Sequence, residues 1–229
     1  KVYNVYADIN NFELLKKKAI EFNPDIIIHL AAQALVTESY KDPYKTIETN
    51  VMGTLNIIEI SKFLKRLKSI LIITSDKCYL NKEIKRGYKE NDELGGEDPY
   101  SASKASAENI FNAYSKSFFN YQSKFGYATA RAGNVIGGGD WSKNRLIPDC
   151  IKSFIKKNQL IIRNPSSTRP WQHVLEPISG YLILAKKLYE KKHKYSGNWN
   201  FGPSSKETMQ VKKVVKLLLH YLGKNKKII

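Results

Sequence analysis

The sequence predicts an α/β protein, built around part of a doubly wound parallel sheet and completed by a smaller C-terminal lobe. Short apolar runs alternate with helical segments over residues 2–130, an order typical of parallel sheets that carry helices on both faces. From Gly137 onward the chain changes to loops, short strands and separate helices. We therefore expect an incomplete sheet domain over residues 1–136 and the lobe mainly over residues 137–229, with some of the later chain returning to the sheet.

Four apolar runs have the length and composition of strands. The first ends at Asp8, the second is followed by Leu30, and the third leads into Thr74. Short runs of aliphatic, β-branched or aromatic residues that end in small or polar residues favour buried strands. We predict strands at residues 2–7, 25–29, 70–73 and 126–130.

Helical segments separate these strands. Residues 10–22 repeat apolar side chains at helical spacing and stop at Asn23-Pro24, a pair that ends helices. Asp98 suits the N-cap and Pro99 the first position of another helix, because a carboxylate accepts free amide hydrogens and proline needs no partner there. We predict further helices at residues 43–67, 98–123, 146–157, 173–191 and 206–222.

The 229-residue chain carries a formal net charge of +17, which first suggests a nucleic-acid partner. However, only six of the 38 basic residues are arginine, and no known nucleic-acid-binding motif accompanies the scattered lysines. A solvated lysine-rich surface is the simpler interpretation, and a nucleic-acid binder is the alternative. Four arginines lie within 39 residues, where planar guanidinium groups would suit phosphate: Arg131, Arg145, Arg163 and Arg169.

Other classes of protein are disfavoured by composition. No apolar run reaches the roughly 18 residues that a membrane-spanning helix needs. Cys78 and Cys150 cannot form a disulfide framework, and the four histidines lack the spacing of metal ligands. Because residues 1–6 have the pattern of a strand, we also expect no signal peptide. These observations predict a cytoplasmic protein without a metal and without a membrane partner.

The glycine-rich turn of doubly wound nucleotide-binding folds has no counterpart in this sequence. Such folds open with a strand, a G-x-G-x-x-G turn and a helix that holds the phosphates. Gly137-Gly138-Gly139 comes late and is followed by Asp140-Trp141 rather than by a helix. We therefore expect the chain to be N-terminally truncated, lacking its first strand–turn–helix.

Tyr100 and Lys104 lie four residues apart near the start of the helix predicted at residues 98–123. This spacing places both side chains on one helix face, where the ammonium and the positive end of the helix dipole favour a phenolate. Such a pair can remove a proton from an alcohol. A surface pair on an amphipathic helix has the same spacing and is the alternative.

Polar residues after the strand predicted at residues 70–73 favour the chemical interpretation. Ser75, Asp76 and Lys77 follow that strand at the edge where open α/β sheets bind ligands, although a simple strand-to-loop turn would have the same composition. Asn50 lies inside the helical segment that precedes this strand. It would either bond a backbone carbonyl or take part in a proton relay, and the sequence leaves both open.

Seven segments carry a family resemblance, namely residues 28–33 (Ile-His-Leu-Ala-Ala-Gln), 48–54 (Glu-Thr-Asn-Val-Met-Gly-Thr), 74–79 (Thr-Ser-Asp-Lys-Cys-Tyr), 98–104 (Asp-Pro-Tyr-Ser-Ala-Ser-Lys), 131–141 (Arg-Ala-Gly-Asn-Val-Ile-Gly-Gly-Gly-Asp-Trp), 169–176 (Arg-Pro-Trp-Gln-His-Val-Leu-Glu) and 199–203 (Trp-Asn-Phe-Gly-Pro). The chain resembles the extended short-chain dehydrogenase/reductase family, in its group of nucleotide-sugar epimerases and dehydratases. Tyr-x-x-x-Lys marks only this superfamily. The third and sixth segments are more specific and resemble the 4,6-dehydratases.

The resemblance implies a Rossmann-type NAD-binding domain, a substrate-binding lobe, and a lyase of deoxysugar synthesis for surface polysaccharide. Tyr100, assisted by Ser75 and Lys104, would take the C4 hydroxyl proton of the sugar while hydride passes to NAD. Asp76 would protonate the leaving C6 hydroxyl, and Lys77 would remove the C5 proton before hydride returns to C6. Many relatives have Glu where this chain has Lys77, and lysine resembles the subgroup that acts on CDP-glucose. To act as a base, Lys77 would need burial or neighbouring positive charge.

The resemblance also implies the ligand contacts. Residues expected to bind NAD are Asp8, Ile9, Leu30, Ala31, Ala32, Asn50, Tyr100 and Lys104. Residues expected to bind the nucleotide sugar are Ser75, Asn134, Arg145, Arg163 and Arg169. Sheet packing would explain the two alanines almost as well. The family further implies a homo-oligomer, a dimer or tetramer, when complete.

Two alternatives stay open besides the nucleic-acid binder. The chain could belong to an epimerase or dehydratase for a UDP, GDP or dTDP sugar. Asp76 and Lys77 argue against an epimerase, which needs no acid for a leaving group at C6. It could instead be a non-catalytic nucleotide-binding module. If the chain is a truncated enzyme, as we expect, it would be weakly active or inactive. The choice between NAD and NADP depends partly on an acidic residue outside this sequence.

Overall fold

The computed structural model describes residues 2–84, 86–119, 123–204 and 208–223. The chain forms two compact units, Lys1–Ala132 with Ser179–Phe201 and Gly133–Ile178 with Gly202–Ile229. In the first unit the elements are α1 (Phe12–Phe22), β1 (Ile26–His29), α2 (Val36–Lys41), α3 (Pro43–Ile47), a π-helical segment (Glu48–Met52), α4 (Gly53–Ser61), β2 (Ser69–Ile73), a 3₁₀ turn (Asp76–Cys78), α5 (Pro99–Tyr114), a second π-helical segment (Ser115–Phe119), β3 (Gly126–Ala132), most of α7 (Leu175–Lys191), a second 3₁₀ turn (Lys192–Tyr195) and β7 (Gly197–Phe201).

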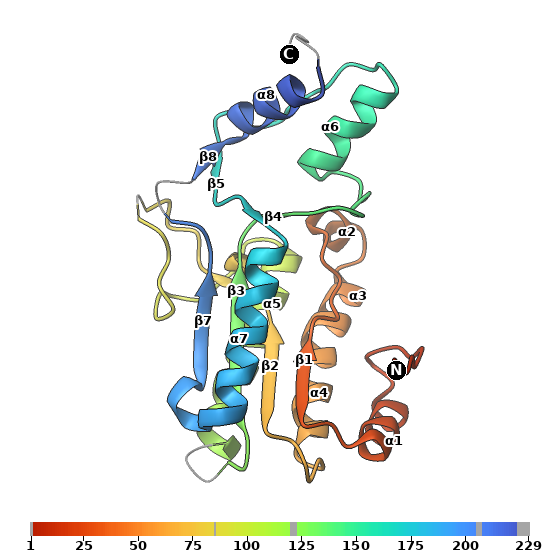
Figure 1. The fold of residues 1–229 in the computed structure, drawn as a ribbon, viewed down its shortest axis with the longest axis vertical. Helices are drawn as coiled ribbons and strands as arrows, with labels where there is room; N and C mark the ends of the chain where they lie inside the picture. Colours follow the sequence, from red (N-terminus) through yellow and green to blue (C-terminus); the bar gives the residue numbers. More distant parts are fainter. Residues whose placement is uncertain (1, 85, 120–122, 205–207, 224–229) are drawn as a thin grey trace. The chain divides into compact units, whose positions relative to one another are not determined.

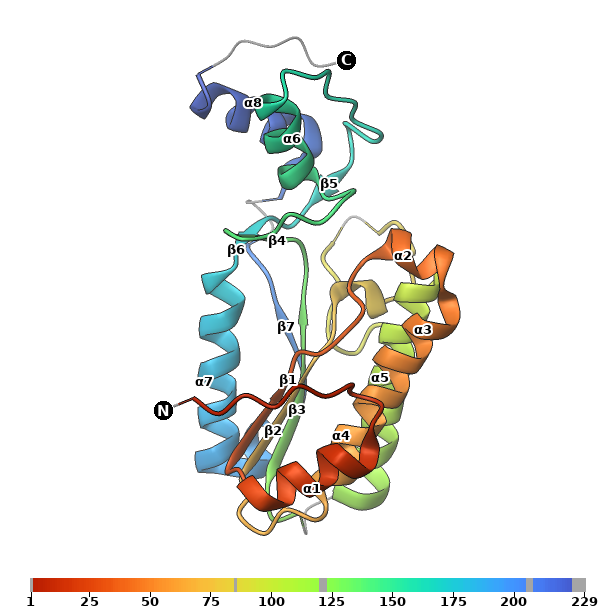
Figure 2. The same ribbon diagram turned by 90° about the vertical axis from the view of Figure 1, so that its right-hand side faces the viewer.

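A parallel sheet in the order β1-β2-β3-β7 forms the centre of the first unit (Figure 1). Helix α7 covers one face, and α3, α4 and α5 cover the other (Figure 2). The third strand is buried along its whole length, as expected of a central strand between two helical layers. The predicted α/β fold with a parallel, Rossmann-like sheet is therefore confirmed.

The core beneath α4 and α5 is aliphatic and aromatic. Ile58 of α4 and Phe111 of α5 pack against Ile70, Ile72 and Tyr127 of the sheet, and all five are buried. Burying such side chains removes apolar surface from water, and this fixes the helices against the strands. The helices α4 and α5 are thereby held on this face of the sheet.

The strand predicted at residues 2–7 does not form. These residues adopt no regular structure, and Val2 and Tyr6 are 85% and 94% exposed. None of the ladders in the described part of the chain includes them. A short run of apolar, β-branched and aromatic residues becomes a strand only where a second strand supplies its hydrogen bonds, so composition alone was misleading here.

The helix predicted at residues 43–67 is divided and shorter. Asp42 caps α3 by accepting the Lys45 amide hydrogen at 2.8 Å, a π-helical segment intervenes, and α4 ends at Ser61. Leu64 and Leu67 are buried, which explains why the apolar spacing of the sequence continues to residue 67. They lie in the connection to β2 rather than in a helix.

The remaining predicted elements occur with shifted ends. α2 had no prediction, α5 is followed by a π-helical segment, and α7 begins two residues later than expected. Residues 120–122, at the end of the helix predicted at 98–123, and residues 206–207, at the start of that predicted at 206–222, lie outside the described residues.

The second unit contains β4 (Val135–Ile136), α6 (Leu146–Ile155), β5 (Thr168–Arg169), β6 (Gln172–His173), β8 (Met209–Gln210) and α8 (Val211–Tyr221). β4 pairs with β6 in parallel, and β5 pairs with β8 in antiparallel orientation. Cys150 of α6 packs with Val215 and Leu219 of α8. Among the described residues, no helix has both the length and the apolar character needed to cross a bilayer.

Candidate active site

The turn that follows β2 carries three of the predicted site residues. The Ser75 hydroxyl accepts the Lys77 amide hydrogen at 3.2 Å and so caps the 3₁₀ turn Asp76–Cys78. It also donates to Asp76 Oδ1 at 3.1 Å. Ser75 is buried, Asp76 is half-buried and Lys77 is exposed. The exposure of Lys77 contrasts with the burial that we considered as one route to a basic amine.

The start of α5 carries the other two predicted catalytic residues, Tyr100 and Lys104. Asp98 caps the helix by accepting the Ser101 amide hydrogen at 2.9 Å, as predicted. Tyr100 and Lys104 are 9% and 7% exposed, so the interpretation as a surface pair is wrong. The Tyr100 amide donates to the Ser39 hydroxyl at 3.2 Å, which ties this first turn to α2.

Lys104 connects α5 to the end of β2. Its Nζ donates to the Ile73 carbonyl oxygen at 3.4 Å. Burial lowers the pKa of Lys104 to about 8, and the nearby charge of Glu108 partly opposes this shift. Ala105 of α5 contacts Cys78 and Tyr79, so the helix packs directly on the turn. The structure thus brings Ser75, Asp76, Lys77, Tyr100 and Lys104 to one end of the sheet.

His29 lies near this lysine but is occupied by a structural contact. Its Nε2 is 3.3 Å from the Thr54 hydroxyl, which donates to the Asn50 carbonyl oxygen at 2.7 Å. Because the Thr54 hydroxyl donates its own hydrogen to Asn50, it can only accept from His29. Nε2 of His29 therefore carries the hydrogen and donates it to Thr54. Burial, followed by the charge of Lys104, lowers the pKa of His29 to about 4.

Asn50 lies in the π-helical segment and is 1% exposed. Its amide group donates to the Gln33 carbonyl at 3.0 Å and to the Ser103 hydroxyl at 2.9 Å, while its oxygen accepts the Gln33 amide hydrogen at 2.8 Å. A bond to a carbonyl was one of the two alternatives, and it is present. The side chain ties the loop after β1 to α5.

The predicted cofactor residues near the N-terminus lie on two segments. Asp8 accepts the Asn10 amide hydrogen at 2.9 Å and the Lys45 amine at 3.4 Å; first the amide bond and then Lys45 lower its pKa. Ile9 packs on Gly53, where an added Cβ would lie 2.8 Å from the Ile9 side chain. At the carboxyl end of β1, Leu30 and Ala31 are exposed and Ala32 is half-buried.

The predicted substrate residues other than Ser75 belong to the second unit. Arg145 precedes α6 and pairs with Asp140 at 3.3 Å. Arg169 lies in β5 and donates to the Thr168 carbonyl at 2.9 Å, Arg163 is exposed, and the Asn134 carbonyl accepts from Gln172 at 3.1 Å.

Arg131 does not share the environment of the other three arginines in its stretch. It lies in β3 of the first unit, is 2% exposed, and forms an ion pair with Glu108 at 2.7 Å. Its guanidinium is used inside the core and is unavailable to a phosphate in this arrangement. The clustering of four arginines in the sequence therefore suggested one phosphate-binding residue too many.

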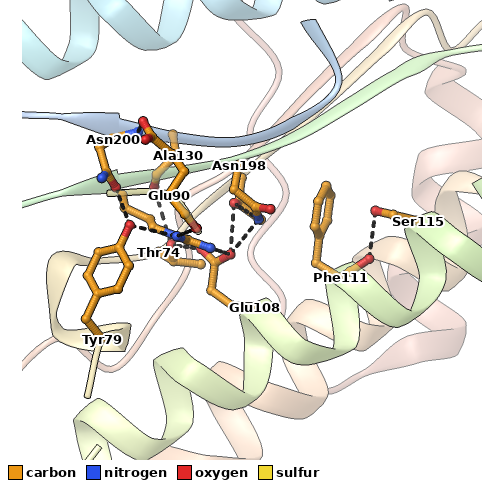
Figure 3. A network of polar contacts seen from close by, with 11 residues as sticks. Thr74, Tyr79, Glu90, Glu108, Phe111, Ser115, Ala130, Asn198 and Asn200 are labelled. Atoms are coloured by element: carbon orange, nitrogen blue, oxygen red, sulfur yellow. Dashed lines mark hydrogen bonds and ion pairs between the residues drawn. The ribbon is translucent and has the colours of Figure 1, made fainter. Parts of the chain in front are cut away.

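Sequence reasoning missed the network around Glu108, which Figure 3 shows. The Glu108 carboxylate accepts hydrogen bonds from Thr74, Thr129, Arg131 and Asn198. One signal could have found it. Glu108 is one further helical turn after Lys104, so a carboxylate follows the Tyr–Lys pair on the same buried helix face. Among the described residues, no three His, Cys, Asp or Glu side chains gather as a metal site requires.

Comparison with known proteins gives consistent matches. The sequence profile of one protein family, described as GDP-mannose 4,6 dehydratase, matches residues 1–227. A relative named CDP-glucose 4,6-dehydratase, from Salmonella typhimurium, is 50% identical over 221 residues, which are 95% of this chain and 62% of the relative. The chain thus spans less than two thirds of that relative.

Solved structures share the fold. UDP-glucose 4-epimerase of Thermotoga maritima, crystallised with UDP-glucose, superposes with a TM-score of 0.84 at 20% identity, covering 97% of this chain and 69% of its own. dTDP-glucose 4,6-dehydratase of Bacillus anthracis, in complex with NAD, gives a TM-score of 0.78 at 26% identity, covering 99% and 67%. Both are similar in fold to the chain described here.

Proposed function

The chain belongs to the GDP-mannose 4,6-dehydratase family, and from this premise we propose that it carries the catalytic residues of a lyase that converts CDP-glucose to CDP-4-keto-6-deoxyglucose with NAD. The observation that supports this most is that Ser75 and the buried Tyr100 and Lys104 all lie at the carboxyl end of β2. Asp76 and Lys77 follow Ser75 directly in the sequence. The 50% identity with the Salmonella CDP-glucose 4,6-dehydratase supports the choice of sugar nucleotide.

Tyr100 is the proposed base of the first step. It lies in the first turn of α5, where the helix dipole and the Lys104 ammonium both favour a phenolate. The phenolate would take the proton of the C4 hydroxyl, and Ser75 would bond the C4 oxygen. Removing this proton as the C4–H bond breaks produces a ketone at C4.

The residues present fit NAD. Lys104 offers a donor and the Tyr100 phenolate an acceptor for ribose hydroxyls, Asp8 offers a further acceptor, and Leu30 with Ala31 presents exposed apolar surface at the end of a parallel strand, where such folds bind dinucleotides. When bound, NAD supplies the acceptor for the C4 hydride and later its donor to C6. Ile9, Ala32 and Asn50 would shape this side of the site rather than react.

Asp76 and Lys77 are proposed for the elimination. A C4 ketone acidifies the C5 hydrogen, so a base can remove it while an acid protonates the C6 hydroxyl, which leaves as water. The half-buried Asp76 is the proposed acid. Lys77 is the proposed base, and because it is exposed in this structure, that role requires the bound nucleotide sugar to cover its amine. An epimerase would need neither group.

Recognition of the nucleotide is proposed for the second unit. Arg145, Arg163 and Arg169 would bind the diphosphate through charge-assisted hydrogen bonds, and Asn134 would contribute a neutral contact. We further propose that the protein assembles as a homo-oligomer.

The test supplies CDP-, dTDP-, UDP- and GDP-glucose in turn and follows the absorbance of the 4-keto product in alkali. We expect product from CDP-glucose first, and a loss of about 100-fold or more in kcat for Tyr100→Phe, because that variant has no proton acceptor. Tyr44→Phe, at a tyrosine 77% exposed, is the matched control and should retain activity. Absence of 4-keto product from CDP-glucose, or full activity in Tyr100→Phe, would overturn the proposal.

A further inference from the structure

Three side chains of α5 form one row along its buried face. Tyr100, Lys104 and Glu108 are four residues apart in succession, and each is buried. Lys104 binds the Ile73 carbonyl, and Glu108 accepts a hydrogen bond from the Thr74 hydroxyl. Two successive turns of the helix therefore hold the two residues that immediately precede Ser75.

The Glu108 carboxylate is itself fixed. Besides Thr74, it accepts from the Thr129 hydroxyl at 3.0 Å, from Arg131 at 2.7 Å and from the Asn198 amide at 2.8 Å. Thr129 and Arg131 lie in β3 and Asn198 lies in β7; Figure 3 shows Asn198 beside the Glu108 carboxylate. A carboxylate held by several donors has little rotational freedom, so the position of its fourth partner is defined by the sheet as well as by the helix.

The far end of the turn is tied to the same pair. Tyr79, which directly follows Cys78, accepts a hydrogen bond from Arg131 at 2.7 Å and donates to Asn200 at 2.7 Å. Within the turn, the Cys78 amide donates to the Ser75 carbonyl at 3.1 Å and the Tyr79 amide donates to the Asp76 carbonyl at 3.3 Å. Ser75, Asp76 and Lys77 thus lie between two anchors that meet at the Glu108–Arg131 ion pair.

We propose that Thr74 is a positioning residue, whose hydroxyl, bound by Glu108, aligns Ser75 and the turn Asp76–Cys78 with Tyr100 and Lys104. The proposal deepens the proposed function and rests on it for the roles of these residues. Thr74 touches no reacting atom in this scheme. It acts by holding the backbone from which Ser75 projects.

The chain offers a matched pair of variants. Thr74→Val and Thr129→Val make the same isosteric change, at threonines 7% and 0% exposed, and each removes one hydrogen bond to Glu108. Thr129→Val also removes the bond that this hydroxyl accepts from the Asn198 amide at 2.8 Å, so the control loses no less than the test variant. Only Thr74 is joined to the turn. Thr74→Ser keeps the hydroxyl and serves as the rescue, which separates the lost bond from a folding defect.

The first readout is amide hydrogen exchange of Lys77, Cys78 and Tyr79, which needs no substrate. We expect Thr74→Val to accelerate it about tenfold, because a bond to a charged group contributes on this scale, while Thr129→Val and Thr74→Ser leave it near the wild-type rate. Unchanged exchange in Thr74→Val, or equal acceleration in both valine variants, would overturn the proposal.

The second readout is steady-state kinetics with CDP-glucose. We expect kcat of Thr74→Val to fall about tenfold with little change in KM, since misalignment raises the barrier of the chemical step without weakening the nucleotide contacts. A raised KM with unchanged kcat would count against the proposal. If the wild type makes no 4-keto product while exchange still separates the two valine variants, the proposed function fails and the positioning by Thr74 stands.

Discussion

Glu108 and Arg131 form an ion pair of 2.7 Å with side chains 0% and 1% exposed. Removing two charges from water is unfavourable unless each is fully bonded. Here the carboxylate has four donors, and the guanidinium also bonds Tyr79 and the Glu90 carbonyl, while the buried Arg131 Nε has no hydrogen-bond partner among the described residues. The pair connects α5, β2 and β3 with the loop that precedes α5, so its main effect is to fix these elements relative to one another.

Arg131→Met should therefore lower the free energy of unfolding by about 3–5 kcal/mol, because it leaves the Glu108 charge buried without a counterion. Urea denaturation followed by circular dichroism measures the change. Arg66→Met removes an exposed ion pair with Asp25, whose side chains are 63% and 39% exposed, and should cost less than about 1 kcal/mol. Equal effects of the two variants would show that the buried pair has no special structural role.

Asn50→Ala should lower the free energy of unfolding by about 2–4 kcal/mol. The substitution removes three hydrogen bonds and leaves the backbone groups of Gln33 without their partner. Asn56→Ala, which removes a single bond to the Ile9 carbonyl, is the matched control and should cost about 1 kcal/mol. Urea titrations at one pH compare both variants, and a smaller loss at Asn50 than at Asn56 would contradict the expectation.

His29 should make stability depend on pH. Its pKa is lowered to about 4 in the folded protein by burial and by Lys104, from 6.5 in the absence of these effects. Between these values the unfolded chain binds more protons than the folded chain, so stability falls as the pH drops from about 6.5 toward 4. The difference between the two pKa values corresponds to a loss of roughly 3 kcal/mol in the free energy of unfolding.

The measurement is urea denaturation of the wild type and of His29→Gln at pH 7 and pH 4.5. The variant should lose less stability than the wild type over this interval, by roughly 2 kcal/mol, because glutamine does not titrate. His220→Gln, at an exposed histidine, controls for the general effect of acid and should follow the wild type. Parallel losses in all three proteins would refute the role of His29.

Local signals in the sequence predicted those parts of the fold that neighbouring residues determine. Asp98 caps α5 as its chemistry suggests, and Asn23-Pro24 directly follows α1. The apolar run at residues 2–7 failed because a strand depends on a partner elsewhere in the chain, which composition does not reveal. Leu64 and Leu67 misled in the same way, since they are buried without being helical.

The shared helix face of Tyr100 and Lys104 was predictable because their motif has a fixed spacing. Glu108 was not predicted, since a glutamate within a helix usually faces solvent, and only the folded chain shows Thr74, Thr129 and Asn198 around it. Arg131 was misjudged for the converse reason. Its neighbours in sequence suggested phosphate, whereas its neighbours in space include a buried carboxylate.

The first unit is assembled from Lys1–Ala132 and Ser179–Phe201, with the second unit's Gly133–Ile178 between them. During synthesis a ribosome that has reached Ile178 has made β1, β2 and β3 but has not yet made Asn198 or Asn200. The nascent sheet must wait for β7 before Glu108 gains its donor from Asn198 and Tyr79 gains its acceptor in Asn200. The end of the sheet that holds the candidate active site is therefore completed only after β7 has emerged, however early its motifs are translated.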